Sequence, residues 1–275
     1  MKGFKYLLLS SLVVLSACSD KSSSNSAVGA VNADSTSIVG GTEVKAGDKE
    51  MRSTVGIYDM QEKALCTGTL IAQNLVLTAG HCVGADPAKM VILFKEKFDG
   101  AQKADIRAVT GAVRHPEYDP KKGTDTADIA VIKFDPGAAG IPAGYGTAKV
   151  LTDFAALQKG TEVVVAGYGL SWSWVIKKGA GTLRTTQLQV ENPHFSDTEI
   201  SLKQSVKHGV CSGDSGGPGY INVNGDLYLW GVVSRGDSLP IPLTPNCFIF
   251  SVFTRVDVYT PFIKEASATL NGLNR

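Results

Sequence analysis

The sequence predicts an all-β protein, and two observations carry that prediction. From residue 38 onward, short apolar runs rich in β-branched and aromatic residues recur between glycine-rich breaks, with little helical spacing. The composition agrees, because 30 glycines and an apolar content of 43% are typical of a packed domain with many tight turns. The runs span residues 70–71, 75–77, 91–94, 129–134, 163–165, 227–233 and 248–253.

Length and charge narrow the class of protein. A chain of 275 residues can bury a substantial core, either as one large all-β unit or as two smaller domains. The 27 Lys and Arg residues nearly balance the 26 Asp and Glu residues, which leaves a formal net charge of +1. Nucleic-acid-binding proteins usually carry a basic excess or stripe, so we expect no nucleic-acid partner.

The N-terminal residues 1–17 have the features of an export signal. Two lysines precede an apolar run at 6–15 that is too short to span a bilayer. The run ends in Leu-Ser-Ala-Cys at 15–18, which resembles the bacterial lipobox. That resemblance implies cleavage before Cys18, lipidation of its thiol and a place in the cell envelope, at the outer membrane. The alternative is an ordinary signal peptide followed by an unmodified cysteine.

Residues 18–37 predict a flexible tether. Ser, Ala and Asn dominate the segment, and large apolar side chains are almost absent. Such a composition cannot bury enough apolar surface to offset the entropy lost on ordering.

The five cysteines favour an exported protein. If Cys18 carries a lipid, four cysteines remain, and an even number in an oxidising compartment predicts two disulfides. Four cysteines allow three pairings, and spacing alone does not choose among them. The four are Cys66, Cys82, Cys211 and Cys247.

The end of the chain predicts a short helix between Val256 and Leu270 that packs against the β-structure. Pro261 falls in its first turn, where the missing N–H costs little. Apolar residues recur there at spacings of three and four, as on one face of a helix. They are Tyr259, Phe262, Ile263, Ala266 and Leu270.

Three separate segments point to one chemistry. They are Thr-Ala-Gly-His-Cys at 78–82, Asp-Ile-Ala-Val-Ile at 128–132 and Gly-Asp-Ser-Gly-Gly-Pro at 213–218. They resemble the TAAHC, DIALL and GDSGGP signatures of the chymotrypsin/trypsin family of serine proteases. The order His, Asp, Ser is that of chymotrypsin rather than of subtilisin or the α/β-hydrolases.

The resemblance assigns a role to each reactive residue. A serine hydroxyl is a weak nucleophile until a base accepts its proton, and histidine titrates near neutral pH, so Ser215 would attack with His81 as base and then acid. Asp128 would orient His81 and stabilise its charged form. The backbone N–H groups of Gly213 and Ser215 would form the oxyanion hole.

The resemblance runs from Ile38 to about Ile263 and implies the chymotrypsin-like fold. That fold has two antiparallel six-stranded β-barrels, here at about 38–150 and 151–275, with the C-terminal helix grouped with the second. It also implies disulfides Cys66–Cys82 and Cys211–Cys247. We expect no cofactor and no metal, because no acidic calcium loop lies between the histidine and aspartate segments.

The residues that would line the primary substrate pocket carry no charge. Gly209 stands where trypsin-like enzymes have the aspartate that pairs with Arg or Lys, and the other pocket residues are Ser234, Gly236 and Ser251. We therefore expect cleavage after uncharged residues. Arg235 replaces the tryptophan that usually floors the substrate groove, which changes the subsites there.

The Ile-Val-Gly-Gly sequence at 38–41 resembles the segment that becomes the family's new N-terminus when a propeptide is removed. The resemblance implies cleavage at Ser37–Ile38, after which the Ile38 ammonium pairs with Asp214. The cut lies after the tether, so it would also release the domain from a lipid anchor. The alternative is that this segment is simply the first strand of a constitutively active enzyme.

The prediction is therefore an exported or surface-anchored serine endopeptidase that works through an acyl-enzyme. Its partners would be protein or peptide substrates, with room for a protein inhibitor, and we expect a monomer. The main alternative is a catalytically inactive binding protein with the protease fold. A second alternative is an esterase that uses the same triad.

Overall fold

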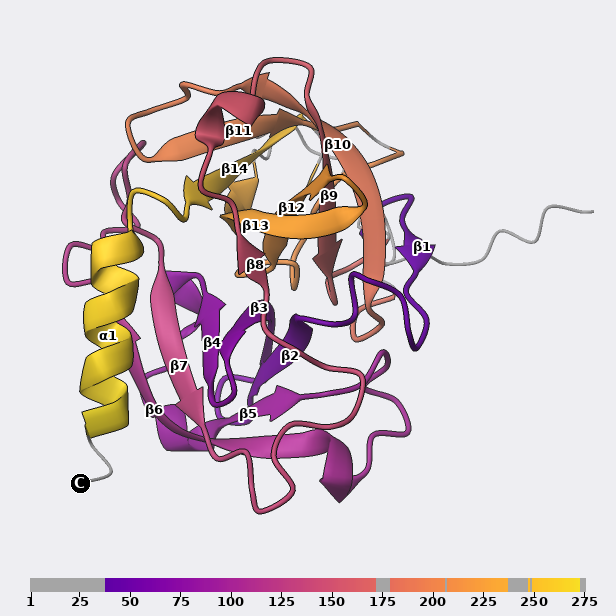
Figure 1. Cartoon of the computed structure of the whole chain (residues 1–275), viewed down its shortest axis with the longest axis vertical. Helices are drawn as coiled ribbons and strands as arrows, with labels where there is room; N and C mark the ends of the chain where they lie inside the picture. Colours follow the sequence, from indigo (N-terminus) through magenta and orange to yellow (C-terminus); the bar gives the residue numbers. More distant parts are fainter. Residues whose placement is uncertain (1–37, 172–178, 206, 237–246, 248, 273–275) are drawn as a thin grey trace, which may run out of the picture. The chain divides into compact units, whose positions relative to one another are not determined.

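The computed structural model describes residues 38–171, 179–205, 207–236, 247 and 249–272. Its strands form two closed barrels, followed along the chain by one α-helix (Figure 1). The predicted signal peptide, Cys18 and the tether at 18–37 lie outside the described residues. Within the described part of the chain, no helix is long and apolar enough to cross a membrane.

The N-terminal barrel closes in the strand order β2-β3-β4-β7-β6-β5, and every neighbouring pair is antiparallel. Its strands are β2 (Thr54–Asp59), β3 (Ala64–Ala72), β4 (Leu75–Thr78), β5 (Met90–Leu93), β6 (Ile106–Arg114) and β7 (Ala130–Phe134).

The C-terminal barrel has the order β9-β10-β11-β14-β13-β12, and β12 pairs with β9 to close it. Its strands are β9 (Glu162–Gly167), β10 (Arg184–Asn192), β11 (Glu199–Lys203), β12 (Pro218–Val223), β13 (Asp226–Gly236) and β14 (Phe250–Arg255). The short strand β1 (Thr42–Glu43) adds to β10, and β8 (Lys149–Val150) runs parallel to β13. The predicted pair of six-stranded barrels is confirmed.

The strand sequences show why these barrels form. In β10, Leu188 and Val190 are buried while the intervening Gln187 and Gln189 are exposed, which is the period-two pattern of a strand with one face in a core. In β7 every residue is buried, including Lys133. Its ammonium donates a hydrogen bond to a carbonyl oxygen of the C-terminal helix over 3.0 Å, and this bond allows a lysine in a buried strand.

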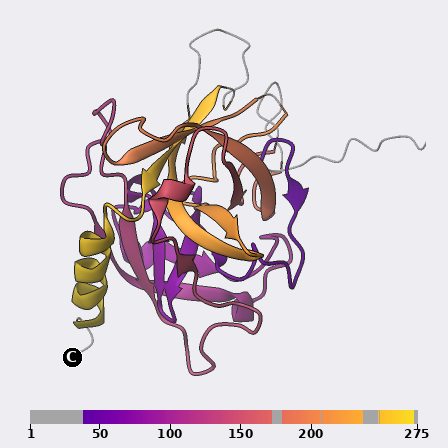
Figure 2. The same ribbon diagram turned by 45° about the horizontal axis from the view of Figure 1, so that its top comes forward.

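The helix α1 (Thr260–Gly272) begins beside Pro261, as expected from the sequence. Ala266 and Leu270 are its buried residues, and the helix packs against β6 and β7 (Figures 1 and 2). Although α1 follows the C-terminal barrel in the chain, it therefore covers the N-terminal one. Among the described connections lie four 3₁₀ turns: η1 (Gly80–Cys82), η2 (Pro87–Lys89), η3 (Lys103–Asp105) and η4 (Phe154–Ala156).

Hydrogen bonds join the two barrels. The hydroxyl of Tyr220 on β12 lies 2.7 Å from Oγ of Ser53 and 3.1 Å from Oγ1 of Thr54 in the N-terminal barrel. Further along the junction, the N–H of Thr67 on β3 donates to the carbonyl oxygen of Ser215 over 2.8 Å. The junction is also where the three predicted catalytic segments come together.

Candidate active site

His81 and Asp128 lie in direct contact at the junction of the barrels. His81 is in η1, immediately after β4, and Asp128 lies just before β7, the strand that pairs with β4. Nδ1 of His81 lies 2.8 Å from Oδ2 of Asp128, and the backbone N–H of His81 donates to Oδ1 over 2.9 Å. Both carboxylate oxygens thus face the histidine, which holds the imidazole in one orientation.

A third donor completes the surroundings of the Asp128 carboxylate. The hydroxyl of Ser234 donates to Oδ2 over 2.7 Å. Asp128 is only 3% exposed, and this burial pushes its pKa upward, but the hydrogen bonds from His81 and Ser234 outweigh burial and hold the pKa below its ordinary value. The carboxylate is therefore ionised at neutral pH, ready to stabilise a protonated His81.

The backbone of Ser215 is held close to the segment that carries His81. The disulfide Cys66–Cys82 joins β3, at the residue before Thr67, to the residue after His81. Sγ of Cys82 lies 3.5 Å from the carbonyl oxygen of Ser215, which is the oxygen that Thr67 also binds. The backbone of Ser215 is therefore fixed against Cys82, the residue that follows His81.

The turn around Ser215 depends on glycine. Gly213 and Gly216 have φ angles of +100° and +78°, a region that residues with a side chain rarely adopt. A Cβ on Gly216 would lie 1.9 Å from Oγ1 of Thr78, so no other residue fits there. In the part of the chain that the structure describes, the N–H groups of Gly213 and Ser215 donate to no protein acceptor.

Asp214, between these residues, is fully buried. Its carboxylate accepts hydrogen bonds from the N–H groups of Gly169 and Cys211, each over 2.8 Å. Burial outweighs those bonds and raises the pKa of Asp214 to about 7. Glycine at 169 is required, because a Cβ there would lie 2.5 Å from the carboxyl carbon.

The start of the described chain also enters the C-terminal barrel. Ile38 is 0% exposed and belongs to the core of that barrel. Val39 forms a β-bridge with Gly209, whose N–H donates to the Val39 carbonyl over 3.2 Å. The second disulfide, Cys211–Cys247, lies two residues beyond Gly209.

The described residues contain one group of side chains close enough to share a metal ion. It consists of Cys66, His81 and Cys82, whose ligand atoms lie within 4.8 Å of one another. Both sulfurs belong to the disulfide, so no thiolate remains there to bind a metal.

Comparison with known proteins shows the family of the chain. The model of the trypsin family matches residues 38–263, which include both barrels and all three predicted catalytic segments. The chain belongs to the trypsin family. It is a serine endopeptidase that hydrolyses peptide bonds in protein or peptide substrates, as the sequence predicted.

Relatives of this trypsin-family chain include animal and bacterial proteases. Chymase from Macaca fascicularis is 30% identical over 247 residues, which cover 85% of this chain and 92% of the chymase. Mast cell protease 2 from Ovis aries is 29% identical, with 83% and 89% covered. Trypsin from Saccharopolyspora erythraea is 28% identical, with 83% and 97% covered.

The predicted pocket residues of this trypsin-family protein have an unpredicted neighbour, Gln204. A Cβ on Gly209 would lie 2.9 Å from Cβ of Gln204, so this side chain occupies the space beside the glycine. The Gln204 amide accepts from the N–H of Val210 over 3.0 Å and is itself 6% exposed. Ser251 is fully buried and pairs with Gly236 across β13 and β14. No sequence motif marks Gln204, because its position follows from packing.

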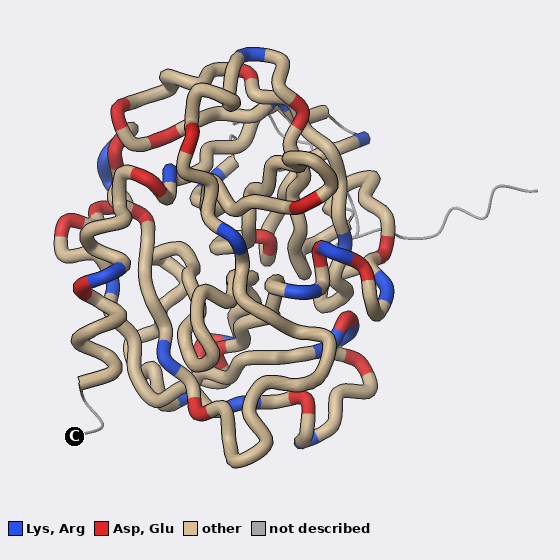
Figure 3. The backbone as a smooth tube through the Cα atoms, viewed as in Figure 1, with Lys and Arg blue, Asp and Glu red and all other residues tan. Residues whose placement is uncertain are grey.

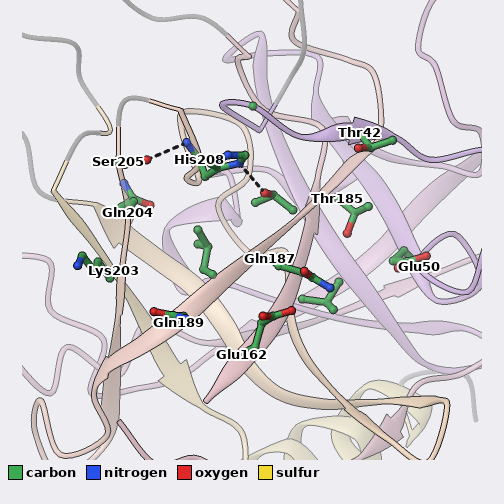
Figure 4. Close-up of a pocket in the computed structure, with 14 residues that line it drawn as sticks. Thr42, Glu50, Glu162, Thr185, Gln187, Gln189, Lys203, Gln204, Ser205 and His208 are labelled. Carbon is green, nitrogen blue, oxygen red and sulfur yellow. Dashed lines mark hydrogen bonds between the residues drawn. The ribbon is translucent and has the colours of Figure 1, made fainter. Parts of the chain in front are cut away.

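A pocket of about 670 Å³ lies elsewhere on the C-terminal barrel, over β9, β10 and β11 (Figure 4). Glu162, Gln187 and His208 are among the residues that line it, and none of the three predicted triad residues does. Nδ1 of His208 lies 3.3 Å from Oγ1 of Thr186. This groove of the trypsin-family chain lies apart from the catalytic segments, and we assign it no part in the reaction.

Proposed function

We propose that His81, Asp128 and Ser215 are the catalytic triad of this serine endopeptidase. The observation that carries the proposal is the Asp128 carboxylate, which accepts hydrogen bonds from His81 and Ser234 and keeps a lowered pKa at the place where Ser215 is held. An inactive binding protein would have no need for a buried carboxylate that binds one histidine through both of its oxygens.

In the proposed reaction the three residues act in turn. Oγ of Ser215 attacks the peptide carbonyl carbon while His81 takes the hydroxyl proton, and Asp128 stabilises the imidazolium. His81 then gives that proton to the leaving amine as the C–N bond breaks, which leaves an acyl-enzyme. A water molecule then attacks the acyl carbon while His81 takes its proton, and His81 gives that proton to Oγ of Ser215 as the acyl–oxygen bond breaks and the acid leaves.

The oxyanion hole is proposed at the N–H groups of Gly213 and Ser215. Their lack of other acceptors in the described structure leaves them able to bind the negatively charged oxygen of the tetrahedral intermediate. Removal of one such donor typically costs about 3 kcal/mol of transition-state stabilisation.

Activation by cleavage at Ser37–Ile38 is the second part of the proposal. The Ile38 side chain already lies in the core of the C-terminal barrel, and Asp214 is a buried carboxylate whose described donors are two backbone N–H groups. A buried carboxylate is costly without a cation. The ammonium that cleavage creates on Ile38 would supply one and would order the turn that carries Gly213.

Specificity for uncharged residues before the scissile bond is proposed for the pocket. Gly209, Gln204 and Ser251 offer amide and hydroxyl groups but no charge to pair with Arg or Lys. The pocket is completed in this proposal by Ser234 and Gly236.

Export in a lipid-anchored form completes the proposal. Two disulfides fit an oxidising compartment, and the sequence at 15–18 supplies the lipidation signal at Cys18. Cleavage at Ser37–Ile38 would release a monomeric enzyme, which a protein inhibitor could regulate. Lys and Arg residues are interspersed with Asp and Glu residues along the described chain, in keeping with a protein rather than a nucleic-acid partner (Figure 3).

A serine-directed phosphonylating reagent tests the triad. We expect mass spectrometry to find one label on Ser215 of the active form, and we expect His81→Ala to lose it. An unlabelled wild-type protein would identify an inactive binding protein instead. If the wild-type enzyme takes the label but, before labelling, hydrolyses esters and not peptides, the esterase is favoured.

A further inference from the structure

The residues that lead into Asp128 have an unusual backbone. Asp125 and Ala127 both have φ angles of +51°, in the left-handed region that residues other than glycine rarely adopt. Such conformations persist only where the surroundings impose them. Because Asp128 follows directly, whatever imposes them also sets the position of its carboxylate.

The C-terminal barrel holds this segment from the other side of the junction. The N–H and hydroxyl groups of Thr198 donate to Oδ1 of Asp125, over 3.0 and 2.8 Å. The N–H and hydroxyl groups of Thr126 donate to Oε1 of Glu199, over 3.4 and 3.1 Å. Glu199, at the start of β11, is 1% exposed, so a carboxylate of one barrel is buried against the loop of the other.

Arg235 holds Glu199 in turn. Its Nη1 and Nη2 donate to Oε1 and Oε2 of Glu199 over 2.7 and 2.9 Å, a two-point arrangement that fixes both groups. Nη2 also donates to the carbonyl oxygen of Gly123 over 2.8 Å, in the same loop. Burial raises the pKa of Glu199, but the Arg235 bonds and charge outweigh it, so the pKa lies below its ordinary value and the pair is ionic.

The pair reaches the catalytic carboxylate by a second route. The register of β13 against β14 shifts between Val233 and Arg235, which marks a β-bulge at Ser234. Nη1 of Arg235 lies 3.4 Å from Oγ of Ser234, and that hydroxyl donates to Asp128 over 2.7 Å. Glu199 and Arg235 therefore contact both the loop before Asp128 and one of its side-chain donors.

We propose that the Glu199–Arg235 ion pair is a positioning device for Asp128, which holds the strained loop 125–127 so that the carboxylate meets His81. The inference rests on the proposed triad. It also gives Arg235, which replaces the tryptophan expected in the substrate groove, a task in catalysis that does not require contact with substrate.

The variant Glu199→Gln tests this role, because it keeps the size and one acceptor but removes the charge that Arg235 binds. We expect kcat on a peptide ester to fall about tenfold with KM unchanged, and phosphonylation of Ser215 to slow by the same factor. The conservative Arg235→Lys keeps the charge without the two-point geometry and should lie between wild type and Arg235→Met. The double variant Glu199→Gln/Arg235→Met should be no slower than the worse single variant, since the two residues act as a unit.

Glu43→Gln is the matched control. It removes the charge that pairs with the buried Arg184 and with Lys97, away from the loop before Asp128. We expect wild-type kcat from it, although its melting temperature falls. If Glu199→Gln does not fold, Arg235→Lys with the same readouts decides the question.

The low-field proton resonance of the His81–Asp128 hydrogen bond gives a readout that a merely structural pair would not move. It should broaden or shift in Glu199→Gln and stay in place in Glu43→Gln. The inference is overturned, while the triad stands, under two conditions. The wild-type protein must be labelled at Ser215, and a folded Glu199→Gln variant must react at the wild-type rate and keep this resonance. A wild-type protein that takes no label at Ser215 overturns the proposed triad and this inference with it.

Discussion

The hydroxyl of Ser234 donates a hydrogen bond to Oδ2 of Asp128, with 2.7 Å between the two oxygens. The same carboxylate oxygen faces Nδ1 of His81. Ser234 belongs to β13 of the C-terminal barrel, whereas His81 and Asp128 belong to the N-terminal segments. Both barrels therefore position the proposed catalytic pair, and the contribution of each barrel can be tested separately.

Ser234→Ala removes one of the donors that lower the pKa of Asp128. A hydrogen bond to a charged group contributes roughly 1.5–3 kcal/mol, so we predict a loss of kcat of about tenfold or more. Steady-state kinetics on a peptide substrate measure it. Ser267→Ala, which removes a helix hydroxyl that bonds the Ile263 carbonyl, is the control and should keep full activity. Equal kcat values for the two variants would show that the Ser234 bond does not contribute to the reaction.

Thr67→Val tests the support of the proposed oxyanion hole. The Thr67 hydroxyl donates to the Gly213 carbonyl over 2.8 Å and accepts from the N–H of Tyr168 over 3.1 Å. Valine keeps the shape but leaves both backbone groups unpaired, so we predict a stability loss of about 1–3 kcal/mol. We also predict a fall in kcat of at least tenfold, because the turn that aims the Gly213 N–H loses its anchor. Chemical denaturation and kinetics measure the two effects. Thr110→Val, which removes a hydroxyl on β6 that lies 3.4 Å from the Lys133 carbonyl oxygen, is the control and should keep full activity. A stability loss without any loss of kcat would confine Thr67 to a structural role.

The pKa of Asp214 predicts a pH dependence of stability before cleavage. Burial raises this pKa to about 7, above the value of about 3.9 for an unfolded aspartate. Between these values the folded protein binds more protons than the unfolded chain, so its free energy of unfolding falls as the pH rises from about 4 to about 7. Pairing with the Ile38 ammonium would lower the pKa of Asp214 and remove this loss. We predict that the melting temperature of the uncleaved Ser215→Ala protein falls over this range and that the form cut at Ser37–Ile38 falls less. Identical pH profiles for the two forms would contradict the pairing.

The same pairing predicts an alkaline limit on activity. It should raise the pKa of the Ile38 α-amino group above its unfolded value of about 7.7–8.0. Its stabilisation is then complete below that value and is lost as the pH climbs through the folded pKa, so activity should fall reversibly at alkaline pH. Mass spectrometry of the most active fraction identifies its N-terminus. Full activity with residues 19–37 still attached would instead favour a constitutively active enzyme.

Substrate preference follows from the uncharged pocket. We predict that phenylalanyl and leucyl substrates are cleaved in preference to arginyl substrates, since Gly209 and Gln204 carry no charge. The preference among apolar residues should be modest, because a hydrophobic pocket discriminates by about 1–3 kcal/mol per methylene. A peptide library in which the residue before the scissile bond is varied through every amino-acid type measures this preference. A preference for arginyl substrates would contradict this prediction, because it would require an acidic side chain in the pocket that the described residues do not supply.

Much of the fold could be predicted from the sequence. Alternating burial in β10 and the continuous apolar run of β7 are local patterns, and Pro261 marks the first turn of α1 correctly. The packing of α1 on the N-terminal barrel could not be predicted in this way. It arises from contacts between residues far apart in the sequence, among them the hydrogen bond from Lys133 to the carbonyl oxygen of Leu270.

The candidate site could likewise be predicted only in part from the sequence. His81, Asp128 and Ser215 stand in motifs whose residues are close in sequence. Arg235 stood out only as a departure from the family, and its partner Glu199 could not be predicted, because β14 lies between the strands that carry them. The bulge at Ser234 is likewise a property of strand register rather than of composition.

Ser215→Ala tests the central claim most directly, because it removes one oxygen from a position held by its backbone rather than by its side chain. Cleavage of a peptide by purified, active wild-type protein is compared with cleavage by the variant after the same processing. We predict that the variant loses peptidase activity completely while its melting temperature stays nearly the same. A folded Ser215→Ala protein that still cleaves at a tenth of the wild-type rate would contradict the assignment of Ser215 as the nucleophile.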